Sequence, residues 1–204
     1  MSTGLNRFVA VDPNKCIGCR VCEVACSVAH ADHVSLTAST VNTPMIPRLY
    51  VSRTADGVVP IQCRHCEDAP CAKACKVSAI VHLDDKILIH EDQCIGCKAC
   101  AIACPFGAID MVPVLKNNIV GAQDHASDIV MELDEVERWV ASKCDLCDGR
   151  EEGPACVQEC PQQALRLVDI HREKKERNAR AAESLLTLKN FSHKKQEAEF
   201  HVDR

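Results

Sequence analysis

Apolar residues fall into short runs over the first 170 positions of the chain, and most runs have the length of a strand rather than of a helix. Strands are expected at 7–11 and 164–168. Two hairpins are expected as well, one from 47–51 and 58–61 around Asp56-Gly57, the other from 79–83 and 87–90 around Asp84-Asp85-Lys86.

Small residues between these runs predict short helical turns at 23–25, 72–74, 101–103 and 157–159. A longer helix is expected at 171–189, ending at Asn190, because apolar residues recur there at helical spacing. These residues are Ala181, Ala182, Leu185, Leu186 and Leu188. The pattern predicts an α+β protein with a C-terminal helix.

Sixteen cysteines form four blocks, and this changes the picture from a small α+β domain to a metalloprotein. The blocks are Cys16, Cys19, Cys22 and Cys26; Cys63, Cys66, Cys71 and Cys75; Cys94, Cys97, Cys100 and Cys104; and Cys144, Cys147, Cys156 and Cys160. Blocks one and three have the bacterial ferredoxin spacing, in which the fourth cysteine ligates a neighbouring cluster. Sixteen thiolates supply the ligands of four [4Fe-4S] clusters.

Structural zinc and disulfides are the alternative uses of so many cysteines. Zinc sites are made from close pairs of cysteines, whereas here a third cysteine and then a fourth follow each pair. Disulfides persist in oxidising compartments, but residues 1–15 contain no apolar stretch resembling a signal peptide. No apolar run approaches the length of a membrane span. The sequence therefore predicts a soluble, cytoplasmic protein, with a zinc-stabilised interaction module as the alternative.

Composition and charge narrow the possible functions. Aromatic residues make up only 3% of the chain, so clusters are expected to fill the core, and the cluster-free chain should fold poorly. A net charge of −5 argues against nucleic acid as a partner. The sequence contains no nucleotide-binding motif, and every cysteine belongs to a block, so no catalytic site is expected.

The chain also repeats itself. The segments CIGCRVCEVAC at 16–26 and CIGCKACAIAC at 94–104 are near copies. Two connecting insertions, 27–62 and 111–143, lack this pattern, and each is either a docking surface or a solvated loop; the second is interpreted as an excursion at the surface. Residues 170–204 form a helical extension.

These motifs resemble those of the four-cluster electron-transfer subunits of molybdenum and tungsten oxidoreductases. The similarity is greatest to the small iron–sulfur subunits of formate hydrogenlyase and hydrogen-dependent carbon dioxide reductase. It covers residues 6–169 through NRFVAVD, CIGCRVCEVAC, MIPRLYV, CRHCEDAPCAKAC, CKACAIACPFGAI, KCDLC and GPACVQECPQQAL.

The resemblance implies which cysteines share a cluster. The implied sets are Cys16, Cys19, Cys22 with Cys160; Cys144, Cys147, Cys156 with Cys26; Cys63, Cys66, Cys71 with Cys104; and Cys94, Cys97, Cys100 with Cys75. One ferredoxin-like half would then consist of 1–26 and 144–169, with the second half, 63–110, nested inside it. Proline often follows the fourth cysteine in this family; Ser27 and Lys76 stand there instead, which puts the loop geometry at these two points in question.

Other residues near the cysteines have candidate roles. Seven basic residues lie within two positions of a cysteine and either raise cluster potentials or are simply exposed. They are Lys15, Arg20, Arg64, Lys73, Lys76, Lys98 and Lys143. Gly18 and Gly96 are expected to let the loop backbone approach sulfur. His65 is either a turn residue or a metal ligand.

The resemblance implies a non-catalytic subunit that conducts electrons between a molybdenum or tungsten formate dehydrogenase and a hydrogenase in anaerobic metabolism. Another iron–sulfur subunit, or a second copy of the chain bound through the C-terminal helix, is a further candidate partner. A free-standing polyferredoxin serving several enzymes, carbon monoxide dehydrogenase among them, is the alternative.

Overall fold

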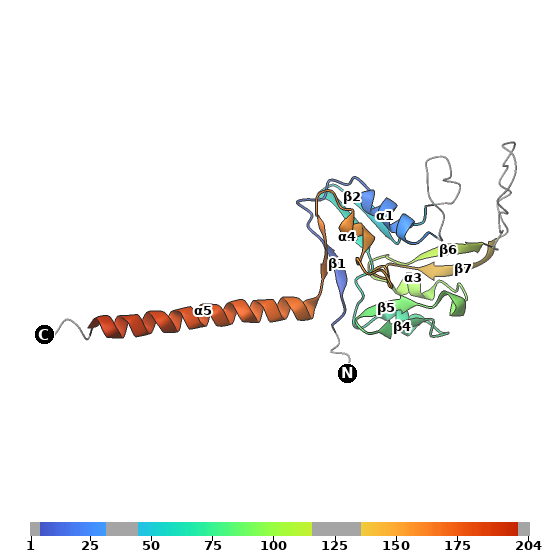
Figure 1. Cartoon of the computed structure of the whole chain (residues 1–204). Coiled ribbons are helices and arrows are strands. Elements are labelled where there is room, and N and C mark those ends of the chain that lie inside the picture. Colours follow the sequence, from blue (N-terminus) through green and yellow to red (C-terminus); the bar gives the residue numbers. More distant parts are fainter. Residues whose placement is uncertain (1–4, 32–44, 116–135, 200–204) are drawn as a thin grey trace. The chain divides into compact units, whose positions relative to one another are not determined.

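The computed structural model describes residues 5–31, 45–115 and 136–199 (Figure 1). The chain divides into two compact units, Met1–Leu167 and Val168–Arg204. The first unit contains short strands and short helices, and the second contains one long helix. The expected mixture of α and β structure is confirmed.

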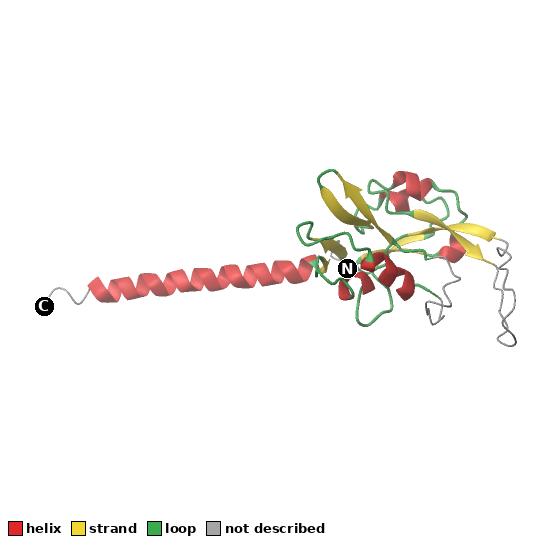
Figure 2. Cartoon of the chain, turned by 90° about the horizontal axis from the view of Figure 1, so that it is seen from above, coloured by secondary structure: helices red, strands yellow, loops and turns green. Residues whose placement is uncertain are grey.

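The strands of the first unit pair two by two (Figure 2). The hairpins are β2 (Leu49–Thr54) with β3 (Gly57–Gln62), β4 (Ile80–Leu83) with β5 (Lys86–Ile89), and β6 (Asp110–Leu115) with β7 (Val136–Ser142). The remaining pair joins β1 (Phe8–Val11) to β8 (Leu165–Val168), so the first and last strands lie side by side.

Short helices follow the first cysteines of each block. They are α1 (Val21–Ala29), α2 (Pro70–Ala74), α3 (Ala99–Ala103) and α4 (Ala155–Gln158), with a 3-10 turn, η1, at Glu91–Gln93. Helix α1 packs against α4, and α2 packs against α3. Blocks one and four are therefore neighbours in space, and so are blocks two and three.

Both expected hairpins are present, with small shifts at their turns. Thr54 pairs with Gly57, so the first turn is Ala55-Asp56, one residue earlier than expected. Leu83 pairs with Lys86, so Lys86 belongs to the second strand and Asp84, at φ 54°, takes the left-handed turn position. Short-range alternation was enough to find both hairpins because their strands are adjacent in sequence.

The interpretation of 111–143 as a surface excursion is wrong for both of its ends. Strands β6 and β7 form an antiparallel ladder from the pair of Asp110 with Ser142 to that of Leu115 with Val136. Val140, Ala141 and Ser142 on β7 are buried. Residues 116–135 lie outside the described part. Twenty residues separate the two strands, which is too far for a local turn signal to connect them.

The core of the first unit is built from aliphatic side chains and cysteines. The largest fully buried side chains are those of Leu49, Ile87, His65, Val9 and Val140. Trp139, Phe106 and Tyr50 are instead 50%, 46% and 39% exposed. The expected absence of a core of large rings is thus confirmed for these three residues.

The second unit is the helix α5 (Ile170–Glu199). Asp169 caps it, since its carboxylate accepts a hydrogen bond from the Arg172 N–H at 3.0 Å. The helix was expected, but its predicted end at Asn190 is wrong, because no Gly or Pro follows that residue before Glu199. Among the described helices, none has the length and apolar character needed to span a membrane.

Candidate iron–sulfur sites

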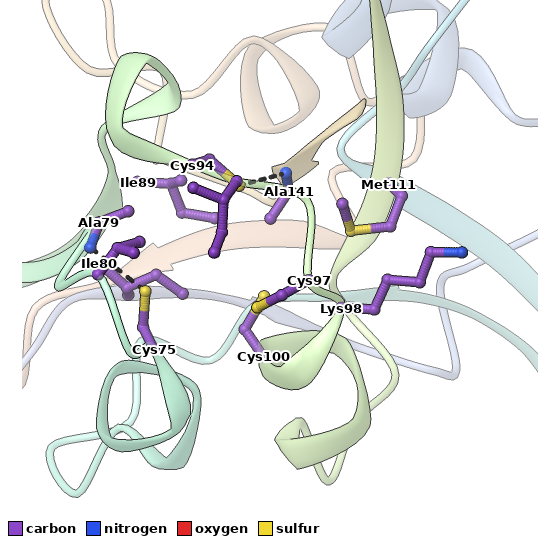
Figure 3. Close-up of a pocket in the computed structure, with 12 residues that line it drawn as sticks. Cys75, Ala79, Ile80, Ile89, Cys94, Cys97, Lys98, Cys100, Met111 and Ala141 are labelled. Atoms are coloured by element: carbon purple, nitrogen blue, oxygen red, sulfur yellow. Dashed lines mark hydrogen bonds between the residues drawn. The ribbon is translucent and has the colours of Figure 1, made fainter. Parts of the chain in front are cut away.

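One cavity brings together four cysteines from two blocks (Figure 3). Cys94, Cys97 and Cys100 come from the loop before α3 and from its first turn, and Cys75 comes from the end of α2. Apolar side chains, including Ile80 and Ile89, form the rest of its wall.

Two further cavities have the same construction. Cys16, Cys19, Cys22 and Cys160 line one of them, and Cys63, Cys66, Cys71 and Cys104 line the other. Each combines three cysteines of one block with the fourth cysteine of another. Four thiols in the same arrangement in each cavity indicate the same kind of occupant in all three.

The last four cysteines also lie close together. Cys26, Cys144 and Cys156 belong to one buried cluster, and after burial the thiols of Cys144, Cys26, Cys147 and Cys22 raise the pKa of Cys156. Cys144, Cys156 and Cys26 are buried, and Cys147 is half-buried. Twelve of the sixteen cysteines thus line three cavities, and Cys26, Cys144, Cys147 and Cys156 are the four that remain.

Backbone N–H groups point at the fourth cysteine of each block. The N–H groups of Ala79, Ala108 and Ala164 donate to the sulfurs of Cys75, Cys104 and Cys160 at 3.3, 3.4 and 3.3 Å. The donor is four residues further on in each case, and Lys76 in place of proline does not alter it. Hydrogen bonds to sulfur stabilise negative charge on a cluster, so these amides suit thiolate ligands.

Cys26 receives its hydrogen bond from elsewhere in the chain. With Ser27 in place of proline, α1 continues to Ala29, and the N–H of His30 bonds back to the Cys26 carbonyl at 3.2 Å. The donor to the Cys26 sulfur is the N–H of Arg48, at 3.2 Å. The loop geometry therefore differs at Ser27, whereas the sulfur keeps an amide donor.

Burial makes these thiols poor acids on their own. It raises the pKa of Cys22 and of Cys71 to about 11 each, and that of Cys144 to about 12. A coordinated metal ion deprotonates a thiol outright. The donor set therefore fits a buried group that supplies positive iron ions, and loading it must release protons.

Asp145 forms polar contacts with several residues near Cys26, and the sequence did not predict this role. Its carboxylate accepts hydrogen bonds from Arg48 at 2.7 Å and from the Cys147 N–H at 2.9 Å, and it lies 2.9 Å from Nε2 of His30. Burial disfavours charge on His30, but hydrogen bonds to Asp145 and Cys26 raise its pKa to about 10. Burial would raise the pKa of Asp145, but His30 and Arg48 lower it to about 2.

His65 has a structural position. It is fully buried, and its Nδ1 accepts the Ile87 N–H at 3.0 Å, which places the ring proton on Nε2. Burial lowers its pKa to about 3, so the ring is neutral. At φ 48° it takes a left-handed turn position between Cys63 and Cys66, which agrees with the interpretation as a turn residue.

The structure gives a different reason for glycine at positions 18 and 96 than the expected approach to sulfur. Gly18 and Gly96 have φ of +71° and +70°. A Cβ on Gly96 would lie 2.5 Å from the Trp139 carbonyl oxygen, and one on Gly18 would lie 2.7 Å from Cγ1 of Val58. The close neighbours are thus a strand backbone and a valine, and not sulfur.

Comparison with known proteins also points to iron–sulfur binding. Residues 8–31 and 87–110 each match a model of a 4Fe-4S binding domain. The Escherichia coli (strain K12) electron transport protein HydN is 43% identical over 169 residues, covering 81% of this chain and 89% of HydN. Formate hydrogenlyase subunit 2 of the same strain is 42% identical over 176 residues, covering 81% of this chain and 83% of that subunit.

Hydrogenase-4 component A of that strain extends the similarity over 195 residues at 40% identity, covering 87% of this chain and 91% of the component. The chain belongs to the iron–sulfur electron-transfer subunits related to formate hydrogenlyase. The family resemblance inferred from the motifs is therefore confirmed. The two matched domains contain blocks one and three, the near copies of the sequence repeat.

Proposed function

We propose that the chain holds four [4Fe-4S] clusters and conducts electrons through them between two partner enzymes. The ligand sets are those named above: Cys16, Cys19, Cys22 and Cys160; Cys26, Cys144, Cys147 and Cys156; Cys63, Cys66, Cys71 and Cys104; and Cys75, Cys94, Cys97 and Cys100. The observation that carries this proposal is the meeting of four thiols in each of three similar cavities.

The same contacts support two nested halves. Pairing of β1 with β8 and packing of α1 on α4 join residues 1–26 to residues 144–169. Packing of α2 on α3 joins blocks two and three within 63–110. Each half then has the paired-block construction of a bacterial two-cluster ferredoxin.

Exposure of the cysteines suggests the order of the four sets. Cys19 and Cys97 are exposed, so the sets that contain them lie nearest to solvent. Cys63 and Cys144 are both buried and close enough for the Cys63 sulfur to influence the Cys144 thiol. The sets of Cys144 and Cys63 are therefore the inner ones, one in each half, and the sets of Cys19 and Cys97 are the outer ones.

The residues of the chain have defined roles in this function. A [4Fe-4S] cluster, when bound, takes up and releases one electron. The cysteines hold it, aliphatic side chains such as Ile80 and Ile89 exclude water from it, and amides such as that of Ala79 stabilise charge on sulfur. The chain itself performs no bond-breaking chemistry in this proposal.

A formate dehydrogenase and a hydrogenase are the proposed partners. The names of two relatives, formate hydrogenlyase subunit 2 and hydrogenase-4 component A, support this choice. The name of HydN, an electron transport protein, favours a second candidate, a free carrier that serves more than one enzyme.

Metal analysis and purification test the proposal together. The anaerobically purified chain should contain about 16 iron and about 16 sulfide per molecule, four of each per cluster. About four zinc and no sulfide would overturn it. A tagged chain isolated from its own cells should bring formate dehydrogenase and hydrogenase with it, whereas a carrier would elute alone.

A further inference from the structure

Lys143 is a buried cation. The residue is only 3% exposed, although lysine is seldom buried in proteins. The ammonium group donates hydrogen bonds to the carbonyl of Cys144 at 2.9 Å and to that of Ile87. Of the seven basic residues near cysteines, Lys143 is thus set apart: Arg64 is half-buried, and Lys15, Arg20, Lys73, Lys76 and Lys98 are exposed.

No carboxylate neutralises this charge among the residues that the structure describes. The two nearest acids in sequence have other cations, since Asp145 pairs with Arg48 and Asp148 pairs with Lys86. Two carbonyl oxygens satisfy hydrogen bonds but carry no net charge. A buried, unpaired cation is strongly unfavourable, so the site calls for negative charge from another source.

The cation lies between the two inner cysteine sets. It is adjacent in sequence to Cys144 and reaches the carbonyl of Ile87 on β5, in the other half. Ile87 lines the cavity of Cys63, Cys66, Cys71 and Cys104, so the ammonium group of Lys143 reaches the wall of one inner set while its own backbone adjoins Cys144 of the other. Cys63 and Cys144 belong to the same buried cluster of side chains at this junction.

We propose that Lys143 is a positioning residue for electron transfer, a fixed positive charge shared by the inner cysteine sets that favours an added electron on either side. The inference rests on the proposed function, because the missing negative charge is that of the clusters. Lys143 exchanges no proton and no electron. The electron that one inner set gives up is the one that the other receives, and the charge of Lys143 stabilises both arrangements.

A purely structural role is the alternative, since the two hydrogen bonds also tie the halves together. Redox potentials separate the two roles. Lys143→Met removes the charge and the donors, Lys143→Arg keeps the charge, and Lys76→Met removes an exposed charge beside Cys75 as the matched control. Each is purified with its clusters, and reduction by dithionite is followed by EPR at controlled potential.

Lys143→Met should lower the reduction potential of two of the four clusters. At a given applied potential, the ratio of reduced to oxidised cluster should fall at least tenfold, which corresponds to about 59 mV for one electron. The other two should not shift. Lys143→Arg should restore the potentials, and Lys76→Met should leave all of them unchanged. Unshifted potentials in Lys143→Met would overturn the inference, even if that variant were less stable.

If Lys143→Met does not retain its iron, Lys143→Gln replaces it, because the amide keeps donors for the carbonyls without the charge. Its potentials are then decisive in the same way. A wild-type protein with zinc in place of iron would refute the proposed function itself. A wild-type protein with four clusters and unshifted variants would refute only the role of Lys143.

Discussion

Arg48 donates a hydrogen bond of 2.7 Å to the Asp145 carboxylate, across 97 positions of sequence. The backbone N–H of the same arginine donates to the sulfur of Cys26. Asp145 in turn accepts the N–H of Cys147 and faces His30 at the end of α1. One carboxylate therefore holds together the segments that contain Cys26 and Cys147, two members of one proposed ligand set.

Asp145→Asn should weaken this cysteine set. The substitution removes the negative charge that Arg48 and His30 share while keeping the size of the side chain. The half-buried guanidinium of Arg48 is left with the more distant carboxylate of Glu91, at 3.6 Å. A loss of about 1–3 kcal/mol is expected, corresponding to roughly a 5- to 150-fold faster release of iron to a chelator. Iron release is followed by the loss of visible absorbance under anaerobic conditions.

Asp68→Asn is the matched control for that variant. Asp68 pairs with Lys73, but its side chain is 79% exposed, and such surface pairs contribute little. Iron release from Asp68→Asn should equal that of the wild type. Equal rates for Asp145→Asn and the wild type would show that the Asp145 contacts do not support the site.

Cys160→Ser should damage the cluster held by Cys16, Cys19 and Cys22. These four thiols line one cavity, although Cys160 belongs to the fourth block. The serine oxygen is a weaker iron ligand than thiolate, so one of the four EPR signals should be altered or lost. Cys156→Ser, four positions earlier, should alter a different signal, because Cys156 lies with Cys144 and Cys26. Identical spectra for the two variants would contradict the crossed sets.

Local sequence patterns predicted much of the fold and most of the candidate ligands. The two hairpins around Asp56 and Asp84 have adjacent strands, so alternation and turn residues revealed them. Cysteine spacing revealed the candidate ligands because three of them must lie in one loop. The grouping of Cys160 with block one had no local signal and rested on family resemblance.

Contacts between distant segments were the part that sequence did not reveal. The ladder between β6 and β7 spans a long insertion, and the roles of Arg48 and Lys143 depend on residues dozens of positions away. Lys143 appeared in sequence as one of several basic residues near cysteines. Burial distinguishes it, and burial is a property of tertiary packing. An Asp between Cys144 and Cys147 was the one available hint for Asp145.

Gly96→Ala should be more destabilising than Gly107→Ala. Both glycines have a positive φ, +70° and +60°, so alanine costs about 1 kcal/mol or more at either position. Only at Gly96 would the new methyl group meet a backbone oxygen, that of Trp139, whereas nothing lies within 4 Å at Gly107. Urea midpoints of cluster bleaching measure the difference. Equal midpoints would show that the strand yields to the methyl group.

Removing iron should unfold the first unit. Its largest fully buried side chains are aliphatic or His65, and three of its ring-bearing residues lie half-exposed, so little apolar packing remains without the clusters. Anaerobic chelation should reduce the far-UV circular dichroism of the chain and make the unit of residues 1–167 susceptible to protease. Reloading with iron and sulfide is the control, and it should restore protection. Sharp, dispersed amide resonances from the iron-free chain would contradict this expectation.

Truncation after Asp169 should leave the iron content unchanged. The sixteen cysteines all lie between Cys16 and Cys160, and α5 begins only at Ile170. In that helix Ala181, Ala182, Leu185 and Leu186 are exposed, while the side chain of Leu188 lies outside the described part. Full iron with loss of partner enzymes or of larger assemblies would assign the helix to assembly, through a partner or a second copy of the chain. Loss of iron would show instead that the helix belongs to the fold of the cluster-binding unit, and Leu185→Ser with Leu186→Ser in the full-length chain would then reproduce that loss.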